Sequence, residues 1–176
     1  AGACKWLLGA AGVAFFYAAK SHMQGMPPHA GAPSAANEFT SPSKGPFVPK
    51  SGAERFHLGI PNLLGIAATR PGLAALVDTG MERVESHVLG LSGRCIAGLQ
   101  DRSIDVLTPE NTNQRGGVVA AIVDDAPAVE HFMSERRIDV YGGHTYNRTL
   151  RIDPHVFNND GDIDTFLAAI DEYDAR

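Results

Sequence analysis

The stretch Cys4–Tyr17, with the sequence CKWLLGAAGVAFFY, holds the features that decide the fold. Lys5 enters a run that is otherwise apolar or small, and Gly9 and Gly12 disfavour a continuous helix of this length. Residues 12–18 are rich in Val, Phe and Tyr, which is typical of a buried strand. A lysine that enters such a strand is poorly placed for solvent, so we expect Lys5 to have a function.

Composition and charge are those of an ordinary globular protein. The chain has 176 residues, of which 44% are hydrophobic and 20% charged, and this balance excludes disorder along the whole chain. Its net charge of −5 gives no electrostatic footprint for nucleic acid. The apolar stretch 6–19 is too short to span a bilayer. Two cysteines are too few for a disulfide framework and suit a reducing compartment, so we expect a cytoplasmic protein. From its charge and its short apolar stretch, we expect that it binds neither nucleic acid nor membrane.

A second feature is the proline-rich segment 21–62, which follows the lysine segment 1–20. Seven prolines, with many Gly and Ser residues, disfavour regular structure there. Long loops inside compact proteins usually carry a function, so we expect this loop to line or cover an active site.

The remainder of the chain predicts helices packed on a small sheet. Apolar residues recur at three- and four-residue steps over 63–100, where Pro71 suits the first turn of a new helix and Gly80 marks a second break. Further on, the pattern predicts strands over 104–107, 117–123, 138–141 and 149–152, and helices over 126–137 and 160–173. This order predicts an α+β C-terminal small domain over 101–176, with helices on a small, mostly antiparallel sheet. The strand near the N-terminus has no partner nearby in sequence and should belong to another sheet.

Four stretches, in this order, resemble the class V aminotransferase superfamily of fold-type I pyridoxal-phosphate enzymes. They are the lysine segment, RFHLGIPN at 55–62, RGGVV at 115–119, and LRIDPHVFN at 150–158 followed by an Asp-Ile-Asp helix start. Each is weak alone, but together they cover nearly the whole chain. The resemblance implies that residues 1–20 carry the cofactor lysine and the last strand of a fold-type I α/β large domain. It also implies that the chain is the C-terminal half of such an enzyme.

The resemblance assigns roles to individual residues. Lys5 would be catalytic, holding pyridoxal 5'-phosphate as a Schiff base and moving the α-proton of the substrate. Arg151 would bind the carboxylate of a small amino-acid substrate through two parallel hydrogen bonds. The alternative is an exposed arginine in a surface ion pair. Gly59, Ile60 and Asn62 match the loop near the cofactor phosphate. Ile60 replaces the family's threonine, so backbone amides would have to bind the phosphate.

Several other residues leave alternatives open. His144 precedes Arg151 between two predicted strands, where it would either contact the substrate or lie in solvent. Arg55 and Arg115 either face the site or form structural pairs. Cys4 stands where relatives usually have histidine, and it is either reactive or a small packed residue. No His, Cys or Asp spacing indicates a metal site.

The absence of a cysteine shortly before Arg151 bears on which reaction we expect. Desulfurases of the superfamily use a loop cysteine shortly before the carboxylate arginine, and this chain has none there, because Cys95 falls on the predicted helix. We therefore expect a lyase acting at Cβ, on a C–S or C–C bond, with an aminotransferase or epimerase as the alternative. A non-catalytic fragment or an unrelated α+β binding domain are the remaining alternatives. The resemblance also implies a homodimer, or completion by an N-terminal half.

Overall fold

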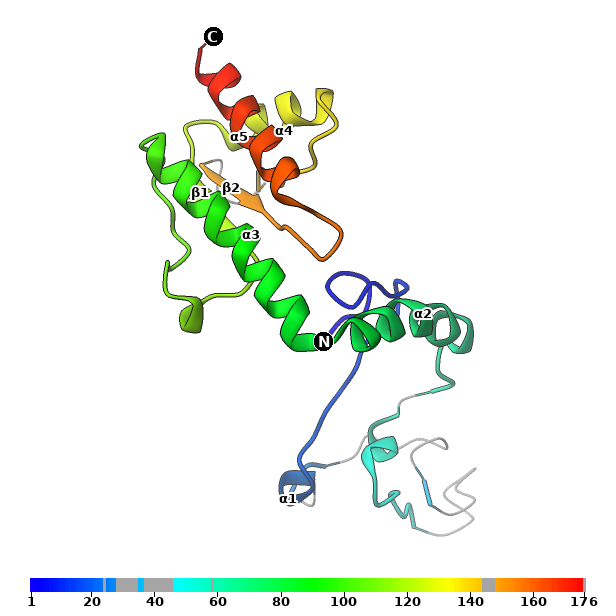
Figure 1. Ribbon diagram of the computed structural model, residues 1–176. Helices are drawn as coiled ribbons and strands as arrows, with labels where there is room; N and C mark the ends of the chain where they lie inside the picture. The colour runs from blue at the N-terminus through cyan, green and yellow to red at the C-terminus, as the bar shows by residue number, and fades with distance from the viewer. Residues whose placement is uncertain (24, 28–34, 37–45, 58, 144–147, 176) are drawn as a thin grey trace. The chain divides into compact units, whose positions relative to one another are not determined.

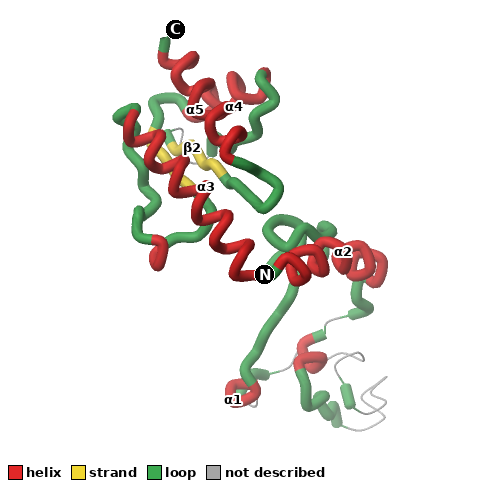
Figure 2. Tube along the Cα trace, in the orientation of Figure 1, coloured by secondary structure: helices red, strands yellow, loops and turns green. Residues whose placement is uncertain are grey.

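Gly80 separates two long helices, α2 (Leu63–Thr79) and α3 (Met81–Asp101). Its φ of +90° is a conformation that glycine adopts at little cost, so the break predicted here is confirmed. In this computed structural model the chain divides next to that point into two units, Ala1–Asp78 and Thr79–Arg176. The structure describes all residues except 24, 28–34, 37–45, 58, 144–147 and 176, and Figures 1 and 2 show the elements of each unit.

Pro71 lies inside α2 and does not begin a new helix, so that prediction is wrong. Proline has no N–H to donate to the carbonyl four residues earlier. The helix nevertheless continues through it, because helices in proteins gain most of their stability from tertiary packing. Asn62 caps the first turn, where its Oδ1 accepts from the Gly65 amide at 2.9 Å.

Residues 12–18 do not form the predicted buried strand. The first unit contains a single bridge here, between Gly2 and Ala14, and Tyr17 is 87% exposed. A strand that is buried on both faces requires a covered sheet, and among the described residues of this unit only the short segment 1–3 forms main-chain hydrogen bonds with it. Between this segment and α2, the described residues contain the short helix α1 (Lys20–Met23), a 3-10 turn at Ala53–Phe56 and an isolated bridge between Ala35 and Pro49.

The second unit contains an antiparallel pair of strands, β1 (Val119–Ile122) and β2 (Thr149–Ile152), both inside predicted ranges. The register places buried residues opposite each other, Val119 with Ile152 and Ala121 with Leu150. Because side chains alternate along a strand, Arg151 lies on the opposite face, away from this core.

The two outer strands predicted at 104–107 and 138–141 are wrong in extent. Each is reduced to one antiparallel bridge, Val106 with Ala121 and Tyr141 with Arg151. After Val106, the Thr108 hydroxyl, and not a main-chain carbonyl, accepts the hydrogen bond from the Ala120 amide. The next residue, Pro109, has no N–H with which to continue the strand. After Tyr141, the Gly142 amide donates to the Glu130 side chain, which belongs to the helix at Ala126–Glu135. The chain therefore turns toward this helix and leaves the sheet.

Three helices pack with this sheet: α3, α4 (Ala126–Glu135) and α5 (Asp160–Asp174). Helix α3 contacts β1, α4 contacts β2, and α5 contacts both helices (Figure 1). The predicted α+β arrangement of helices on a small antiparallel sheet is therefore confirmed for this unit. Its core includes Leu91, Cys95, Leu99, Phe132, Met133, Phe166 and Ile170.

One arginine of α3 and the arginines that cap the C-terminal ends of α3 and α4 bind acidic residues of α5. The pairs are Arg94 with Asp164 at 2.6 Å, Arg102 with Asp171 at 2.6 Å and Arg136 with Glu172 at 2.5 Å. The hydrogen bond from Arg102 lowers the pKa of the Asp171 carboxyl. All three pairs are partly exposed, so each contributes modestly and depends on salt.

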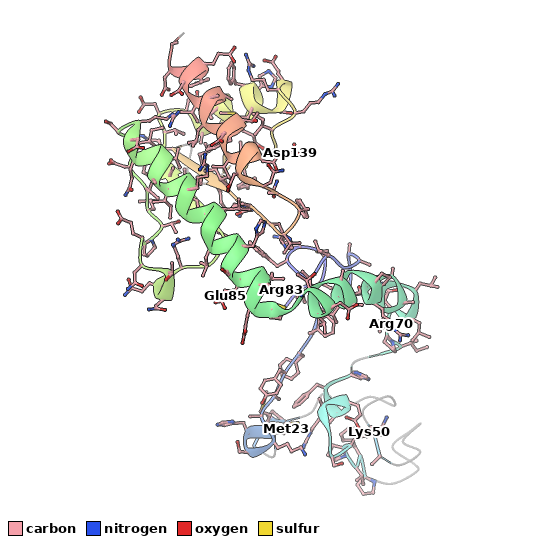
Figure 3. The ribbon with its side chains drawn as sticks, viewed as in Figure 1. Met23, Lys50, Arg70, Arg83, Glu85 and Asp139 are labelled. Atoms are coloured by element: carbon pink, nitrogen blue, oxygen red, sulfur yellow. The ribbon has the colours of Figure 1, made fainter. Side chains whose placement is uncertain are left out.

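We expect Asp171→Asn to reduce the acid sensitivity of the second unit. A carboxyl whose pKa is lower in the folded state stabilises that state above its unfolded pKa, and this stability is lost as the pH falls through the folded pKa. The asparagine variant should therefore lose less unfolding free energy than the wild type below about pH 4. Urea unfolding measured across that range tests this. Asp139→Asn is the control, because Asp139 is exposed and has no ion pair among the described residues (Figure 3). Equal changes in both variants would contradict the assignment.

Candidate functional site

Lys5 lies on an exposed turn of the first unit. The Lys5 carbonyl accepts a hydrogen bond from the Leu8 amide at 3.0 Å, which closes this turn. The expectation that this lysine is hidden from solvent is wrong. The run after it folds back as a loop instead of continuing as a buried strand, so its side chain stays accessible. We refer to residues 4–13 as the lysine loop.

Small residues on one face of α2 hold the lysine loop. Gly65, Thr69 and Gly72 are spaced by four and three positions, which places them on the same helical face. The buried Thr69 hydroxyl donates to the Gly65 carbonyl at 2.8 Å and accepts from the Ala10 amide at 3.0 Å. We call these three residues the small-residue stripe.

The loop approaches the stripe so closely that larger side chains would not fit. A Cβ added at Gly65 would lie 2.8 Å from Cγ2 of Val13, and one added at Gly72 would overlap the Leu8 carbonyl. The stripe thus fixes the loop that carries Lys5. Sequence reasoning missed it, although the spacing of small residues within a predicted helix was a visible signal.

The predicted phosphate loop lies next in sequence to α2. Gly59 and Ile60 are exposed, and Ile60 is 89% accessible. The Asn62 side-chain oxygen caps the helix, and its amide nitrogen would be 3.5 Å from a Cβ added at Gly12 in the lysine loop. The structure therefore brings Asn62 against the lysine loop, while the backbone of Gly59 and Ile60 remains open.

Arg151 belongs to the second unit and is half-exposed, not buried. Its Nε donates to Oδ2 of Asp153 at 3.0 Å, and its Cζ lies 4.9 Å from the ring centre of Tyr141. The surface ion pair that was the alternative interpretation is therefore present. Its role in substrate binding stays a prediction, and His144 lies outside the described residues.

Arg115 is a structural residue. Its guanidinium donates to the Leu89 carbonyl at 3.2 Å, to the Glu110 carbonyl at 3.3 Å and to the buried Ser92 hydroxyl. It therefore joins α3 to the chain that leads into β1. Arg55 is half-buried in the first unit, and among the described residues its Nε has no hydrogen-bond partner.

The two cysteines have opposite environments. Cys95 is fully buried in the core of the second unit, and burial raises the pKa of its thiol to about 12. Such a thiol is a packing residue and not a nucleophile. Cys4 is exposed next to Lys5, so its interpretation as a buried residue is wrong.

The described residues contain neither a cluster of metal ligands nor a helix suited to cross a membrane. Across the described residues, no three His, Cys, Asp or Glu side chains gather as a metal ion would require. None of the helices in that part of the chain has both the length and the apolar character needed to cross a membrane.

Comparison with known proteins gives a family match and several relatives. A family model described as aminotransferase class-V matches residues 1–166. The chain is 28% identical over 131 residues to the "Probable cysteine desulfurase" of Pyrococcus abyssi, covering 68% of this chain and 33% of the relative. It is 29% identical over 136 residues to the kynureninase of Stenotrophomonas maltophilia, covering 72% and 31%. The chain thus spans about a third of the length of these curated relatives.

Several solved structures have a fold similar to that of this chain. The cystine C-S lyase C-DES, in complex with its product cysteine persulfide, matches with a TM-score of 0.80 at 21% identity, over 95% of this chain and 44% of that protein. A C-DES variant with glycine covalently linked to its PLP cofactor matches with a TM-score of 0.80 at 20% identity, over 95% and 43%. The apo cysteine desulfurase of Thermococcus onnurineus NA1 matches with a TM-score of 0.71 at 25% identity, over 84% and 39%. The likeness to C-DES is one of fold.

Proposed function

Because this chain belongs to the class V aminotransferase family, we propose that it is part of a pyridoxal-phosphate enzyme that acts on a small amino acid. The observation that carries this proposal is the position of Lys5. Its side chain is exposed, on a loop that the small-residue stripe of α2 fixes through Leu8, Ala10 and Val13. A fixed loop with an accessible amine is what covalent attachment of a cofactor requires.

The first unit fits the cofactor in two respects. The Lys5 amine is accessible for attachment, and the exposed backbone of Gly59 and Ile60 offers amides that could bind a phosphate. The Asn62 side-chain oxygen is already committed to the α2 cap, so we expect Asn62 to support this loop through the helix it caps. When bound, pyridoxal phosphate supplies an electron sink for charge that develops on the amino acid.

The residues of this chain would divide the remaining work. Arg151 would hold the substrate carboxylate, since a guanidinium matches a carboxylate in charge and geometry. The Lys5 amine would carry the proton that leaves or returns at the substrate Cα. Arg115 has no part in this scheme, because its guanidinium is bound within the protein.

For the reaction we propose a lyase that breaks a C–S or C–C bond at Cβ. The burial of Cys95 supports this proposal, because its thiol has no exposed surface in the core of the second unit, where burial also raises its pKa to about 12. The likeness in fold to C-DES, a cystine C-S lyase, agrees with it. An aminotransferase or epimerase of the same superfamily is the second candidate, favoured only by the family match. A fragment without activity is the third.

We also propose that further protein covers the first unit in the whole enzyme, which would be a cytoplasmic homodimer. Large apolar side chains of α2 are exposed, among them Leu63 at 66%, Leu64 at 85% and Val77 at 61%. Such a surface suits contact with a second copy or with the remainder of the protein.

Reduction with borohydride tests the role of Lys5. We expect the native chain, incubated with pyridoxal phosphate and then reduced, to carry a pyridoxyl adduct on Lys5. Its yield should be at least about tenfold above that on Lys20, the other exposed lysine among the described residues, because only a lysine in a cofactor site gains from contacts beyond its own amine. Peptide mass spectrometry locates the adduct, and Lys20→Arg is the matched control for Lys5→Arg. Equal labelling of both lysines would contradict the proposal.

Incubation with amino acids then separates the candidate reactions. Pyruvate and ammonia released from L-cystine would mark a lyase, whereas amino transfer to 2-oxoglutarate would mark an aminotransferase. A Lys5 adduct with neither activity would favour the inactive fragment.

A further inference from the structure

Arg151 is held in place by two neighbours, Tyr141 and Asp153. We propose that both are positioning residues, which fix the guanidinium so that its outer edge, Nη1 and Nη2, receives the carboxylate of an amino acid. This inference rests on the proposed function, because it specifies how the carboxylate site is built.

The backbone sets the three side chains on one face. Tyr141 and Arg151 form a bridge in which each amide donates to the other's carbonyl, at 3.0 and 2.8 Å. Directly opposed residues of an antiparallel pair project to the same side of the sheet. Asp153 follows Arg151 by two positions, and residues two apart on an extended chain share a face. The face is the one away from the core, since Leu150 and Ile152 fill the other.

The contacts to Arg151 use only part of its hydrogen-bonding capacity. Asp153 accepts from Nε at 3.0 Å, and the Arg151 Cζ lies over the Tyr141 ring, 4.9 Å from the ring centre. Within the described residues, Nη1 and Nη2 donate no hydrogen bond. These two nitrogens form the end of the guanidinium fork, which can bind both oxygens of a carboxylate.

Other arginines of the same unit show what a saturated guanidinium looks like. In Arg102, Nε and Nη2 bind both oxygens of Asp171 at 2.6 Å, and Nη1 binds the Gly98 carbonyl at 2.8 Å. Arg136 is bound in the same manner by Glu172 and the Phe132 carbonyl. Arg151 differs because the one carboxylate that it binds among the described residues is attached at Nε, which leaves the outer edge for a ligand.

This arrangement has a physical advantage for binding. A free arginine side chain loses considerable rotamer freedom when it closes on a ligand, and a side chain that is already fixed loses less. The Tyr141 ring adds an attraction to the cation without using any of its N–H groups. Removing either neighbour should therefore weaken carboxylate binding while leaving the charge of Arg151 in place.

Phenylglyoxal, which modifies arginine side chains, provides the test on the full chain. The modification rate of each arginine is followed by peptide mass spectrometry, and protection by L-alanine gives a dissociation constant at Arg151. L-Alaninol, which lacks the carboxylate, is the control ligand. We expect Arg151 to react faster than Arg102 and Arg136, and to be protected by L-alanine alone.

Variants then assign the roles of the two neighbours. We expect Asp153→Ala and Tyr141→Ala each to raise the dissociation constant for L-alanine about tenfold, in line with the loss of a fixed side chain. Tyr141→Phe keeps the ring and should bind as the wild type does. Unchanged binding in both alanine variants would overturn the proposal, and so would tighter binding in Asp153→Ala, which would make Asp153 a competitor for the guanidinium.

The protection experiment on Arg151 and the borohydride experiment on Lys5 can succeed or fail independently of each other. Protection of Arg151 without a Lys5 adduct would support the carboxylate site and count against the cofactor site. A Lys5 adduct without protection of Arg151 would leave the cofactor proposal standing and overturn this one.

Discussion

Replacing Gly72 by alanine is expected to loosen the lysine loop, although the same substitution strengthens most helices. Alanine stabilises a helix interior by about 1 kcal/mol relative to glycine. At Gly72, however, the new Cβ would overlap the Leu8 carbonyl, which belongs to the backbone and cannot rotate away. Overpacking of this kind costs about 1–3 kcal/mol or more, so the loop should shift away from α2.

Hydrogen exchange of the lysine loop measures this effect. The Ala10 amide, which donates to the Thr69 hydroxyl at 3.0 Å, should lose about tenfold or more of its protection, since 1.4 kcal/mol corresponds to a factor of ten. Attachment of pyridoxal phosphate to Lys5 should fall in parallel. Gly90→Ala is the control, because a Cβ at Gly90 of α3 meets nothing within 4 Å. Unchanged exchange in the Gly72 variant would show that the stripe does not hold the loop.

Leu99→Ala is expected to destabilise the second unit by about 2–5 kcal/mol, which is much of the stability of a small domain. Leu99 has no exposed surface and lies in the core shared by α3, α5 and the sheet. Removing its side chain loses buried apolar area and leaves a cavity that the surrounding helices cannot fully close.

Urea unfolding followed by circular dichroism of the helices gives the size of this loss. Leu107→Ala is the matched control, because Leu107 is 59% exposed in the same unit and its truncation should change stability by about 0.5 kcal/mol or less. A loss below about 1 kcal/mol for Leu99→Ala would mean that this core is loosely packed.

Much of the second unit could be predicted from the sequence because its signals are local. Helices α4 and α5 begin at caps that are visible in the chain, Asp125 for α4 and the Asn159–Asp162 capping box for α5. The apolar pattern predicted both strands of the central pair, whereas the exposure of Arg151 on the outer face was found only in the structure.

The candidate site was predictable in its residues but not in its construction. Lys5 and Arg151 were singled out by motif. The spacing of small residues in α2 was visible, but the local pattern did not indicate which segment Thr69 would bind, or that Asp153 and Tyr141 would hold Arg151. These contacts join positions far apart in the chain or set side-chain orientation, and hydrophobic periodicity reports neither.

By itself, the sequence determined the helices, the central strand pair and the family, since these follow from caps, periodicity and ordered motifs. Tertiary structure alone decided three other matters: α2 continues through Pro71, residues 12–18 remain a loop with exposed aromatic side chains, and the outer strands shrink to single bridges. In each case the local preference is worth a few kcal/mol at most, and the neighbours that pack against a segment, or fail to cover it, outweigh that preference.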